Sequence, residues 1–484
     1  MHLARTYSPT VVIAVLAISG MAASLMQTLL VPLLSELPGI LNASVDDVSW
    51  VITATLLSSA VATPTLSRLA DMFGKKRMML VCLGLLLIGS VIGALSSTLM
   101  MVIVARIFQG TASALIPIGM SIMRDELPEE KLSSAVALMS ATLGIGAAIG
   151  MPLSGIVFTY FGWHAIFWVS GIFAIAMFMA ILIIVRESEI RTGGKFDYLG
   201  AVLLSGALTA LLMAISKGGS WGWTSSPTLF AFGLTAAILA IWIPLEFKNE
   251  RPLVDLRVSM RRTVLMTNLT SILMGFAMYA NMLATFQLLE MPESTGYGPG
   301  LTSLEAGLVM IPTSLAMVVL APVSAKITRL FSAKITLIVG AALMGFGYLE
   351  RLFFNDTVVL IAIAAVIVAA GTAISFAAMP LLIMSAVPET ETAAANGLNT
   401  LLRSIGSSVS SAAIAGILAV LVVEVGGNNL PSQSAFQMIF MLAAAASIIG
   451  ALIAIAIPKP EHNELGPLDP ALVAELTHHH EETK

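Results

Sequence analysis

The sequence has little charge, a single cysteine and few aromatic residues. Only 11% of its 484 residues are charged, whereas soluble proteins average about 25%, so the chain has too few charges to cover a water-facing surface. Cys82 has no second cysteine to pair with, which excludes an intrachain disulfide and a cysteine-rich zinc site. The sequence also lacks a G-x-x-x-x-G-K-S/T phosphate loop, so it provides no ATPase site of that class.

Hydrophobic residues make up 57% of the chain and form long apolar runs. Because one span needs about 20 apolar residues, the runs predict an all-α membrane protein with fourteen membrane-spanning helices. The first run is too long for a signal-peptide core, so we expect it to be retained. The predicted spans are 10–33, 48–66, 78–97, 99–122, 134–157, 164–185, 198–216, 227–246, 263–288, 304–325, 335–353, 358–386, 395–423 and 435–457.

The basic residues predict the orientation of these spans. If the N-terminus is cytoplasmic, all but four of the 24 Lys and Arg residues fall in inner segments, and the exceptions are Lys217, Arg351, Arg106 and Arg403. Cytoplasmic loops carry an excess of positive charge. We therefore expect both termini to lie in the cytoplasm.

An internal repeat divides the chain. The segment Pro64–Lys76 resembles Pro322–Lys334, and Pro128–Gly146 resembles Pro388–Gly406 at nearly the same offset. The repeat predicts two parallel six-helix bundles with two helices inserted between them. The substrate site is then expected between the bundles, which rock against each other. The predicted domains are an N-terminal bundle at 1–190, the inserted helices and linkers at 191–262, a C-terminal bundle at 263–458 and a cytoplasmic tail at 459–484.

Three motifs carry a family resemblance. Ser67–Lys76 resembles the loop signature of the major facilitator superfamily, Arg106–Gly110 resembles its R-x-x-Q-G motif, and Gly146–Gly155 resembles the antiporter signature of span five. The whole chain resembles the fourteen-helix drug:proton antiporter branch. This resemblance implies a monomeric secondary transporter in a bacterial inner (cell) membrane, which exports hydrophobic small molecules, including drugs and antibiotics, in exchange for protons. No cofactor, metal site or nucleic-acid partner is expected.

The loop between spans two and three is a candidate gate. Arg68, Asp71, Gly74, Lys75 and Lys76 lie within it. Asp71 is near the C-terminal end of a helix and opposes the helix dipole, so we expect it to need a cationic partner. The functional interpretation is a charge latch that closes the inner side, and the alternative is positive-inside charge alone.

Span five is rich in small residues. Gly146, Gly150, Pro152 and Gly155 make it bendable and allow other helices to approach closely. By the resemblance, this helix borders the interface between the bundles and seals the cavity there. The alternative is packing alone.

Two arginines lie within spans, where an unpartnered charge is costly. Arg106 is interpreted as a coupling or gating residue that pairs with carbonyls or with Gln109, and the alternative is an anchor that snorkels to the outer interface. Asn396, Asn399 and Arg403 share one helix face by their spacing. That face is predicted to line a cavity, with a hydrogen-bonded packing network as the alternative.

Several other polar side chains are substrate or coupling candidates. The amides of Gln27, Asn281 and Gln287 can bind substrate or a neighbouring helix. No Asp or Glu lies near the middle of a predicted span, which makes fully charged cations poorer substrates. Glu290 is the first choice for a titrating group if protons drive transport, and the alternative is a hydrated loop carboxylate.

Two other functions fit a polytopic membrane protein. An importer or facilitator of a small polar metabolite would need several cavity polar groups, and a membrane scaffold or sensor would need a partner-binding domain. The sequence shows few of the former, and its predicted tail is short. No nucleophile–base set or spaced metal ligands indicate an enzyme.

Overall fold

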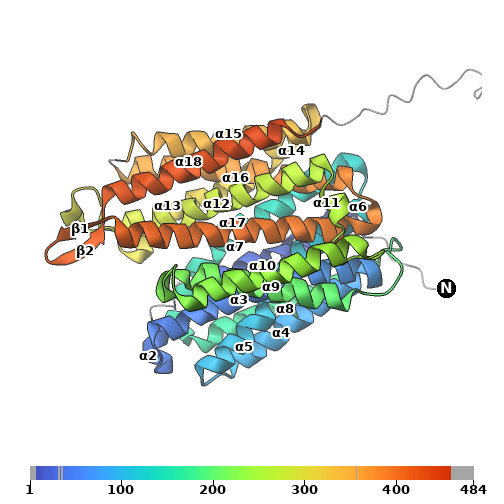
Figure 1. Ribbon diagram of the computed structural model, residues 1–484, viewed down its shortest axis with the longest axis horizontal. Coiled ribbons are helices and arrows are strands. Elements are labelled where there is room, and N and C mark those ends of the chain that lie inside the picture. The colour runs from blue at the N-terminus through green and yellow to red at the C-terminus, as the bar shows by residue number, and fades with distance from the viewer. Residues whose placement is uncertain (1–6, 31–32, 34–35, 356, 459–484) are drawn as a thin grey trace, which may run out of the picture.

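A computed structural model describes residues 7–458 except 31–32, 34–35 and 356. Within this part the chain is almost entirely helical (Figure 1). The helices are α1 (Pro9–Thr28), α2 (Leu37–Leu41), α3 (Val45–Phe73), α4 (Lys75–Ala94), α5 (Leu99–Gly110), α6 (Leu115–Glu126), α7 (Glu129–Phe161), α8 (His164–Ile184), α9 (Tyr198–Trp221), α10 (Ser226–Lys248), α11 (Leu256–Ser259), α12 (Arg262–Glu290), α13 (Ser303–Val319), α14 (Ala321–Leu330), α15 (Ala333–Glu350), α16 (Val358–Ala386), α17 (Thr392–Val420) and α18 (Gln433–Ile455).

Each predicted apolar segment corresponds to one of these helices or to two consecutive ones. By length and composition, 13 stretches of the described chain can cross a membrane, and α5–α6 and α13–α14 each act as one such stretch. The helix α7 is not among these 13 stretches, but with 33 residues it is also long enough to cross a membrane. Local chemistry sets several helix ends: Ser44 caps α3, and Thr302 and Glu305 form a capping box on α13.

Two separate hydrophobic cores divide the helices into halves. One core consists mainly of residues from α1 and α3–α8, here called the N-terminal half. The other consists of residues from α12–α18, here called the C-terminal half. Because each half has its own core, the two can shift against each other without either being unpacked.

The helices α9 and α10 pack side by side along the junction of the halves. A small core cluster joins Leu204 of α9 and Trp242 of α10 to Ala60 of α3 and Leu401 of α17. In Figure 1 the pair lies across the middle of the molecule. The helix α9 therefore contacts both halves, and α10 packs mainly against α9.

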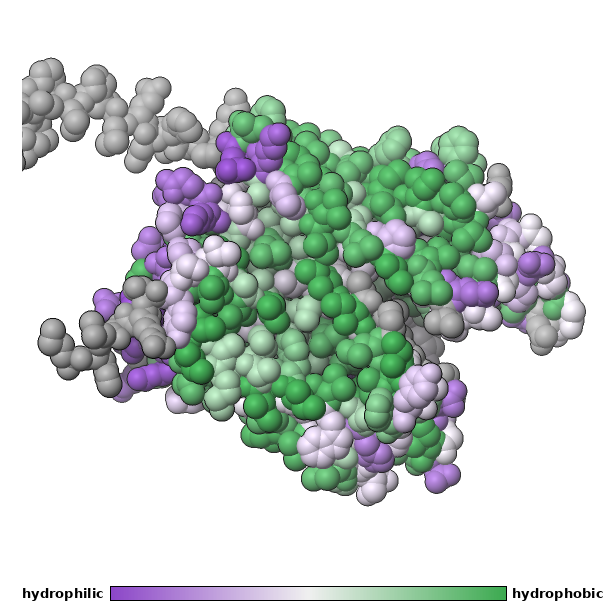
Figure 2. Space-filling view, turned by 180° about the vertical axis from the view of Figure 1, so that it is seen from behind, coloured by the Kyte–Doolittle hydropathy of each residue, from purple (hydrophilic) through white to green (hydrophobic). Residues whose placement is uncertain are grey.

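The surface divides into an apolar band and two polar ends. Figure 2 shows hydrophobic residues around the middle of the molecule and hydrophilic residues at both ends. Exposed side chains of the band include Ile172 and Ile183 of α8 and Val202 of α9. Such a band suits lipid contact.

One end of the molecule, here called the basic end, carries the α3–α4, α6–α7 and α16–α17 connections. The opposite end, here called the hairpin end, carries β1 (Val422–Val425) and β2 (Asn428–Pro431), which pair antiparallel. Figure 2 shows a notch between the two halves at the hairpin end.

The hairpin corrects the predicted span 395–423. The helix α17 ends at Val420, and Gly426 and Gly427, both with positive φ, form the turn between the strands. A Gly-Gly pair suits such a two-residue turn, because it needs left-handed backbone that other residues avoid. The apolar sequence of β1 hid this change from helix to strand.

Candidate functional site

The carboxylate of Asp71 joins the two halves at the basic end. It is fully buried near the end of α3. Its Oδ1 accepts a hydrogen bond from the backbone N–H of Ala393 at 3.2 Å, and its Oδ2 accepts one from Ala394 at 2.8 Å. Both amides belong to the first turn of α17, where N–H groups have no partner within the helix and the dipole is positive. The N-cap residue of α17, Glu391, provides no side-chain cap, so Asp71 caps a helix of the other half.

The expected cations act on Asp71 only at longer range. The carboxylate accepts from two amides at a positive helix end and has no ion pair within 4.0 Å among the described residues, while Lys75 and Arg68 stabilise its charge from further away. The nearest positive partner is the start of α17, more than 300 residues away in sequence. No sequence pattern near Asp71 predicts this contact.

Two arginines of the N-terminal half reach the same segment. Arg68 Nη1 lies 3.8 Å from Glu391 Oε1. Arg124 Nη1 donates to Thr392 Oγ1 at 2.6 Å, and its Nη2 donates to the carbonyl of Val387 at 3.2 Å. Arginine provides several donors in one plane, which lets Arg124 bind two acceptors at once.

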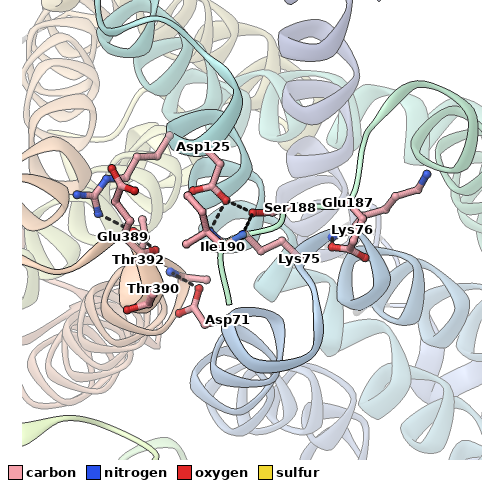
Figure 3. A network of polar contacts seen from close by, with 12 residues as sticks. Asp71, Lys75, Lys76, Asp125, Glu187, Ser188, Ile190, Glu389, Thr390 and Thr392 are labelled. Atoms are coloured by element: carbon pink, nitrogen blue, oxygen red, sulfur yellow. Dashed lines mark hydrogen bonds and ion pairs between the residues drawn. The ribbon is translucent and has the colours of Figure 1, made fainter. Parts of the chain in front are cut away.

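The loop after α8 adds a contact to the same segment. Figure 3 shows Ser188 of this loop beside Asp125, with Thr390 and Thr392 near Asp71. Thr192 donates through its hydroxyl to the carbonyl of Thr390 at 2.5 Å, and its backbone N–H donates to the carbonyl of Asp71 at 2.8 Å. We call the contacts of Arg68, Asp71, Arg124 and Thr192 with residues 387–394 the basic-end latch. The latch crosses between the halves.

Lys75 lies within the N-terminal half instead of at the latch. Its Nζ pairs with Asp125 Oδ2 at 2.5 Å, and Ser188 Oγ donates to the same oxygen at 2.5 Å. Lys75 is fully buried. The pair ties α4 to α6 and to the chain after α8, which holds the N-terminal side of the latch in place.

Glu187 caps the start of α4. Its two carboxylate oxygens accept from the backbone N–H groups of Lys76 and Arg77, each at 3.1 Å. Gly74 has φ of +120°, and a Cβ there would lie 2.7 Å from the Glu187 carboxylate. Glycine is therefore required at this turn for both its conformation and its size.

The side chains of the basic loop thus have separate partners. Lys76 Nζ donates to the carbonyl of Leu182, and Arg77 is largely exposed, 3.9 Å from Glu187. Among the described residues, none of these cations forms an ion pair with Asp71 within 4.0 Å. Asp125, Glu187 and Ser188 were not predicted from the sequence, because their roles depend on contacts between distant segments. The repeat at Pro388–Glu389 was the one sequence signal for the 387–394 segment.

Arg106 is buried between helices of the N-terminal half. Its Nη1 donates to the carbonyl of Met26 at 2.8 Å and to Gln109 Oε1 at 2.9 Å, and Gln109 Nε2 donates to Ser90 Oγ at 3.2 Å. These are the carbonyl and Gln109 contacts expected from the sequence. With 3% exposure, Arg106 does not snorkel to an interface.

Arg403, Asn396 and Asn399 all lie buried on one face of α17. Asn399 Nδ2 donates to Asn268 Oδ1 on α12 at 2.9 Å, and Asn396 Nδ2 donates to the carbonyl of Thr392 in its own helix. Asn399 therefore takes part in the packing network that was the alternative to a cavity face, whereas Asn396 bonds only within its own helix among the described residues. The Arg403 guanidinium instead lies 4.8 Å from the Phe376 ring centroid, with no acceptor among the described residues.

Comparisons with known proteins give the family. The model of the Major Facilitator Superfamily matches residues 16–411. The chain belongs to the major facilitator superfamily. It is 27% identical to the MFS-type transporter YvkA of Bacillus subtilis (strain 168), over 90% of this chain and 93% of that protein. It is 26% identical to the multidrug resistance protein Stp of Mycobacterium tuberculosis (strain CDC 1551 / Oshkosh), over 77% and 69%.

Solved structures agree on the fold. The human organic anion transporter MFSD10 superposes with a TM-score of 0.66 at 13% identity, covering 93% of this chain and all of that one. Major facilitator proteins are transporters, so this chain is a multi-pass membrane transporter of small molecules.

Two glycines of α7 in this major facilitator protein, Gly146 and Gly150, face α1, whereas Gly144 faces Met317 of α13. A Cβ on Gly146 would lie 2.8 Å from Ser24, and one on Gly150 would lie 1.9 Å from Thr28 Oγ1. The expected seal between the bundles therefore does not use these two glycines, which pack within the N-terminal half. Gly155 has open space beside it, and the side chain of Pro152 lies outside the described residues.

The remaining predicted residues lie apart from the latch. Asn281 Nδ2 donates to the carbonyl of Ala365 on α16 at 3.1 Å. Gln287 Oε1 is buried without a partner among the described residues. Glu290 is half-buried at the hairpin end and accepts a hydrogen bond from Ser303 at 2.5 Å. The Gln27 side chain lies outside the described residues.

Proposed function

We propose that this chain exports hydrophobic small molecules across the cell membrane by alternating access, in exchange for protons. The observation that carries the proposal is the basic-end latch, in which Asp71 of one half holds the first turn of α17 in the other. A rocking transporter needs a contact that closes one side and can be released. The multidrug resistance protein Stp, a relative over 77% of this chain, supports drug-like molecules as the cargo.

The proposal includes the predicted layout of the chain. Fourteen spans place both termini in the cytoplasm, with six-helix bundles at 1–190 and 263–458 and the pair α9–α10 inserted between them. The positive charges of the basic end support its cytoplasmic location. The latched arrangement is then closed to the cytoplasm, and the notch at the hairpin end faces outward.

We propose Asp71, in place of Glu290, as the group whose protonation releases the latch. Glu290 lies at the half-buried end of α12, with a serine hydroxyl as its partner, so its charge controls no contact between the halves. Asp71 is buried and makes two charge-assisted hydrogen bonds across the halves. Protonation would remove the negative charge that these bonds and the helix dipole need.

The charged residues within the spans suggest which substrates the protein carries. Arg106 already has two acceptors, whereas the Arg403 guanidinium lies over an aromatic ring and has no acceptor among the described residues. No carboxylate of the described residues lies near the middle of a span to neutralise a cationic substrate. Neutral or anionic hydrophobic molecules are therefore the better cargo, because an unpartnered cation in this environment is costly.

A flux experiment tests the proposal. Pump-deficient bacteria expressing the chain are loaded with neutral, anionic and cationic lipophilic fluorescent dyes, and dye retention is measured before and after the proton gradient is collapsed. We expect exclusion of neutral and anionic dyes that disappears with the gradient. Asp71→Asn should lose exclusion at equal expression, whereas Glu130→Gln, an exposed carboxylate at the same end, should keep it.

Two outcomes would contradict the proposal. Exclusion that survives collapse of the gradient would rule out proton exchange as the driving force. The absence of exclusion for every dye in well-expressing cells would reject drug export, and would favour import of a polar metabolite or a non-transporting role.

A further inference from the structure

A cavity of about 300 Å³ lies within the C-terminal half at the hairpin end. It lies between the ends of α12 and α15, the start of α16, the start of α18 and the loop around Tyr297. No residue of the basic-end latch lines it. Its volume is at the lower end of the range for small-molecule pockets.

Arg351 contributes an incompletely paired charge to this cavity. Its side chain is 1% exposed, and its Nη1 donates to Thr285 Oγ1 at 2.7 Å. Its Nε and Nη2 are buried with no hydrogen-bond partner in the part of the chain that the structure describes, and none of the described carboxylates lies within 4.0 Å of it. The Phe440 ring centroid, 4.9 Å from the guanidinium carbon, covers one face. A buried cation with two free donors needs an acceptor to balance it.

Two helix N-termini meet at the same cavity. Val358 begins α16, which has 29 residues, and Gln433 begins α18, which has 23. Both residues line the cavity. The caps Thr357 and Ser432 each accept from one amide of the first turn, which leaves further amides without intrahelical acceptors. Both dipoles therefore add positive potential to that of Arg351.

The remaining walls suit a molecule with an apolar body. Leu288, Ile361 and Phe436 are apolar, and the amides of Gln433 and Gln437 provide further donors. Glu350, next to Arg351 in sequence, is not among the lining residues. The cavity thus combines one planar cation, two positive helix ends and an apolar wall.

We propose that this cavity binds a small organic anion, whose carboxylate or phosphate oxygens accept hydrogen bonds from Arg351 and from the starts of α16 and α18. A guanidinium matches the two oxygens of such a group in one plane. The ligand comes either from solution or from a lipid headgroup, since both present the same oxyanion. The site lies inside one half and does not depend on the proposed export function.

Thermal unfolding of the full chain in lipid nanodiscs tests this site. In discs of zwitterionic lipid, benzoate and phenyl phosphate should raise the unfolding midpoint by several degrees at saturation, whereas uncharged benzyl alcohol should not, because a ligand stabilises the state it binds. Arg351→Met should abolish the shift. Arg329→Met, an exposed arginine at the opposite end, should retain it.

A second variant covers the case in which Arg351→Met does not fold. Val358→Phe fills the cavity and leaves Arg351 in place, so it should also abolish the shift. If discs with anionic lipid raise the midpoint in an Arg351-dependent way and soluble anions add nothing, the ligand is a lipid headgroup. Equal shifts in all folded variants, or no shift with any anion or anionic lipid, would overturn the proposal.

Discussion

The two ends of the molecule are stabilised by different kinds of contact. At the basic end, Asp71 and Arg124 of the N-terminal half bind backbone groups and Thr392 of the C-terminal half. At the hairpin end, Tyr297 donates to the carbonyl of Pro431, and Ser303 donates to Glu290. Both hairpin-end contacts stay within the C-terminal half. Breaking the basic-end contacts should change the position of one half relative to the other. Breaking the hairpin-end contacts should change only the local stability of the C-terminal half.

The two ends differ because the polar contacts of the basic end lie between the two hydrophobic cores, whereas those of the hairpin end lie within one half. Each half buries its own apolar cluster. A small cluster that includes Ala141 and Ala321 joins the halves, and the latch adds a few charge-assisted hydrogen bonds between them. Such bonds depend on the charge state of one carboxylate, whereas apolar packing does not. A latch built in this way can open without unfolding either half.

The largest effect is expected from Lys75→Met, which leaves Asp125 buried without its cation. Removing one member of a buried pair costs roughly 3–5 kcal/mol, so the free energy of unfolding in detergent should fall by about that amount. The double variant Lys75→Met with Asp125→Leu should recover much of the loss. If Lys75→Met is as stable as Arg77→Met, which alters an exposed side chain, the pair does not hold the N-terminal side of the latch.

Asp71→Asn should shift the equilibrium between the halves by about 1.5–3 kcal/mol, the range for a hydrogen bond to a charged group. Spin labels on cysteines at Glu130 and Lys326, in a Cys82→Ala background, report the distance across the basic end. We expect longer distances in Asp71→Asn and, in the unsubstituted labelled protein, at acidic pH. Unchanged distance distributions would show that Asp71 does not control closure.

Arg68→Gln should have a smaller effect of the same sign. Its contact with Glu391 is 3.8 Å long and Glu391 is partly exposed, so water screens the pair, and solvent-screened ion pairs contribute about 0.2–1 kcal/mol. The same labels should show a modest rise in the open population of Arg68→Gln, and this rise should be larger at low salt, where the ion pair is less screened. A larger effect than that of Asp71→Asn would reverse the proposed order of the two contacts.

Ser303→Ala at the hairpin end should have the smallest effect. Its hydrogen bond to Glu290 is exposed, so its loss should cost about 0.5 kcal/mol in unfolding free energy. The distance across the basic end should not change. A change in this distance would show that the two ends are coupled, and would make Glu290 a candidate coupling group again.

Much of the fold was predictable, and the candidate site only in part. The apolar runs located the helices because a membrane span is defined by its local composition. The basic loop pointed to Asp71 and Gly74, and the spacing of Arg106 and Gln109 predicted their contact. The partners of Asp71 and Lys75 were not predictable, since an amide of α17 or a carboxylate of α6 approaches them only after the helices pack.

By itself, the sequence determined that the chain is helical, that it enters a lipid bilayer and that one end is basic, since each depends on the residues of a single segment. Tertiary structure alone decided that Asp71 caps α17, that Gly146 and Gly150 pack on α1 and that Arg351 lies buried at a cavity. Hydrogen-bond partners, close approaches and burial are properties of pairs of segments. They exist only once distant helices are brought within a few ångströms of each other.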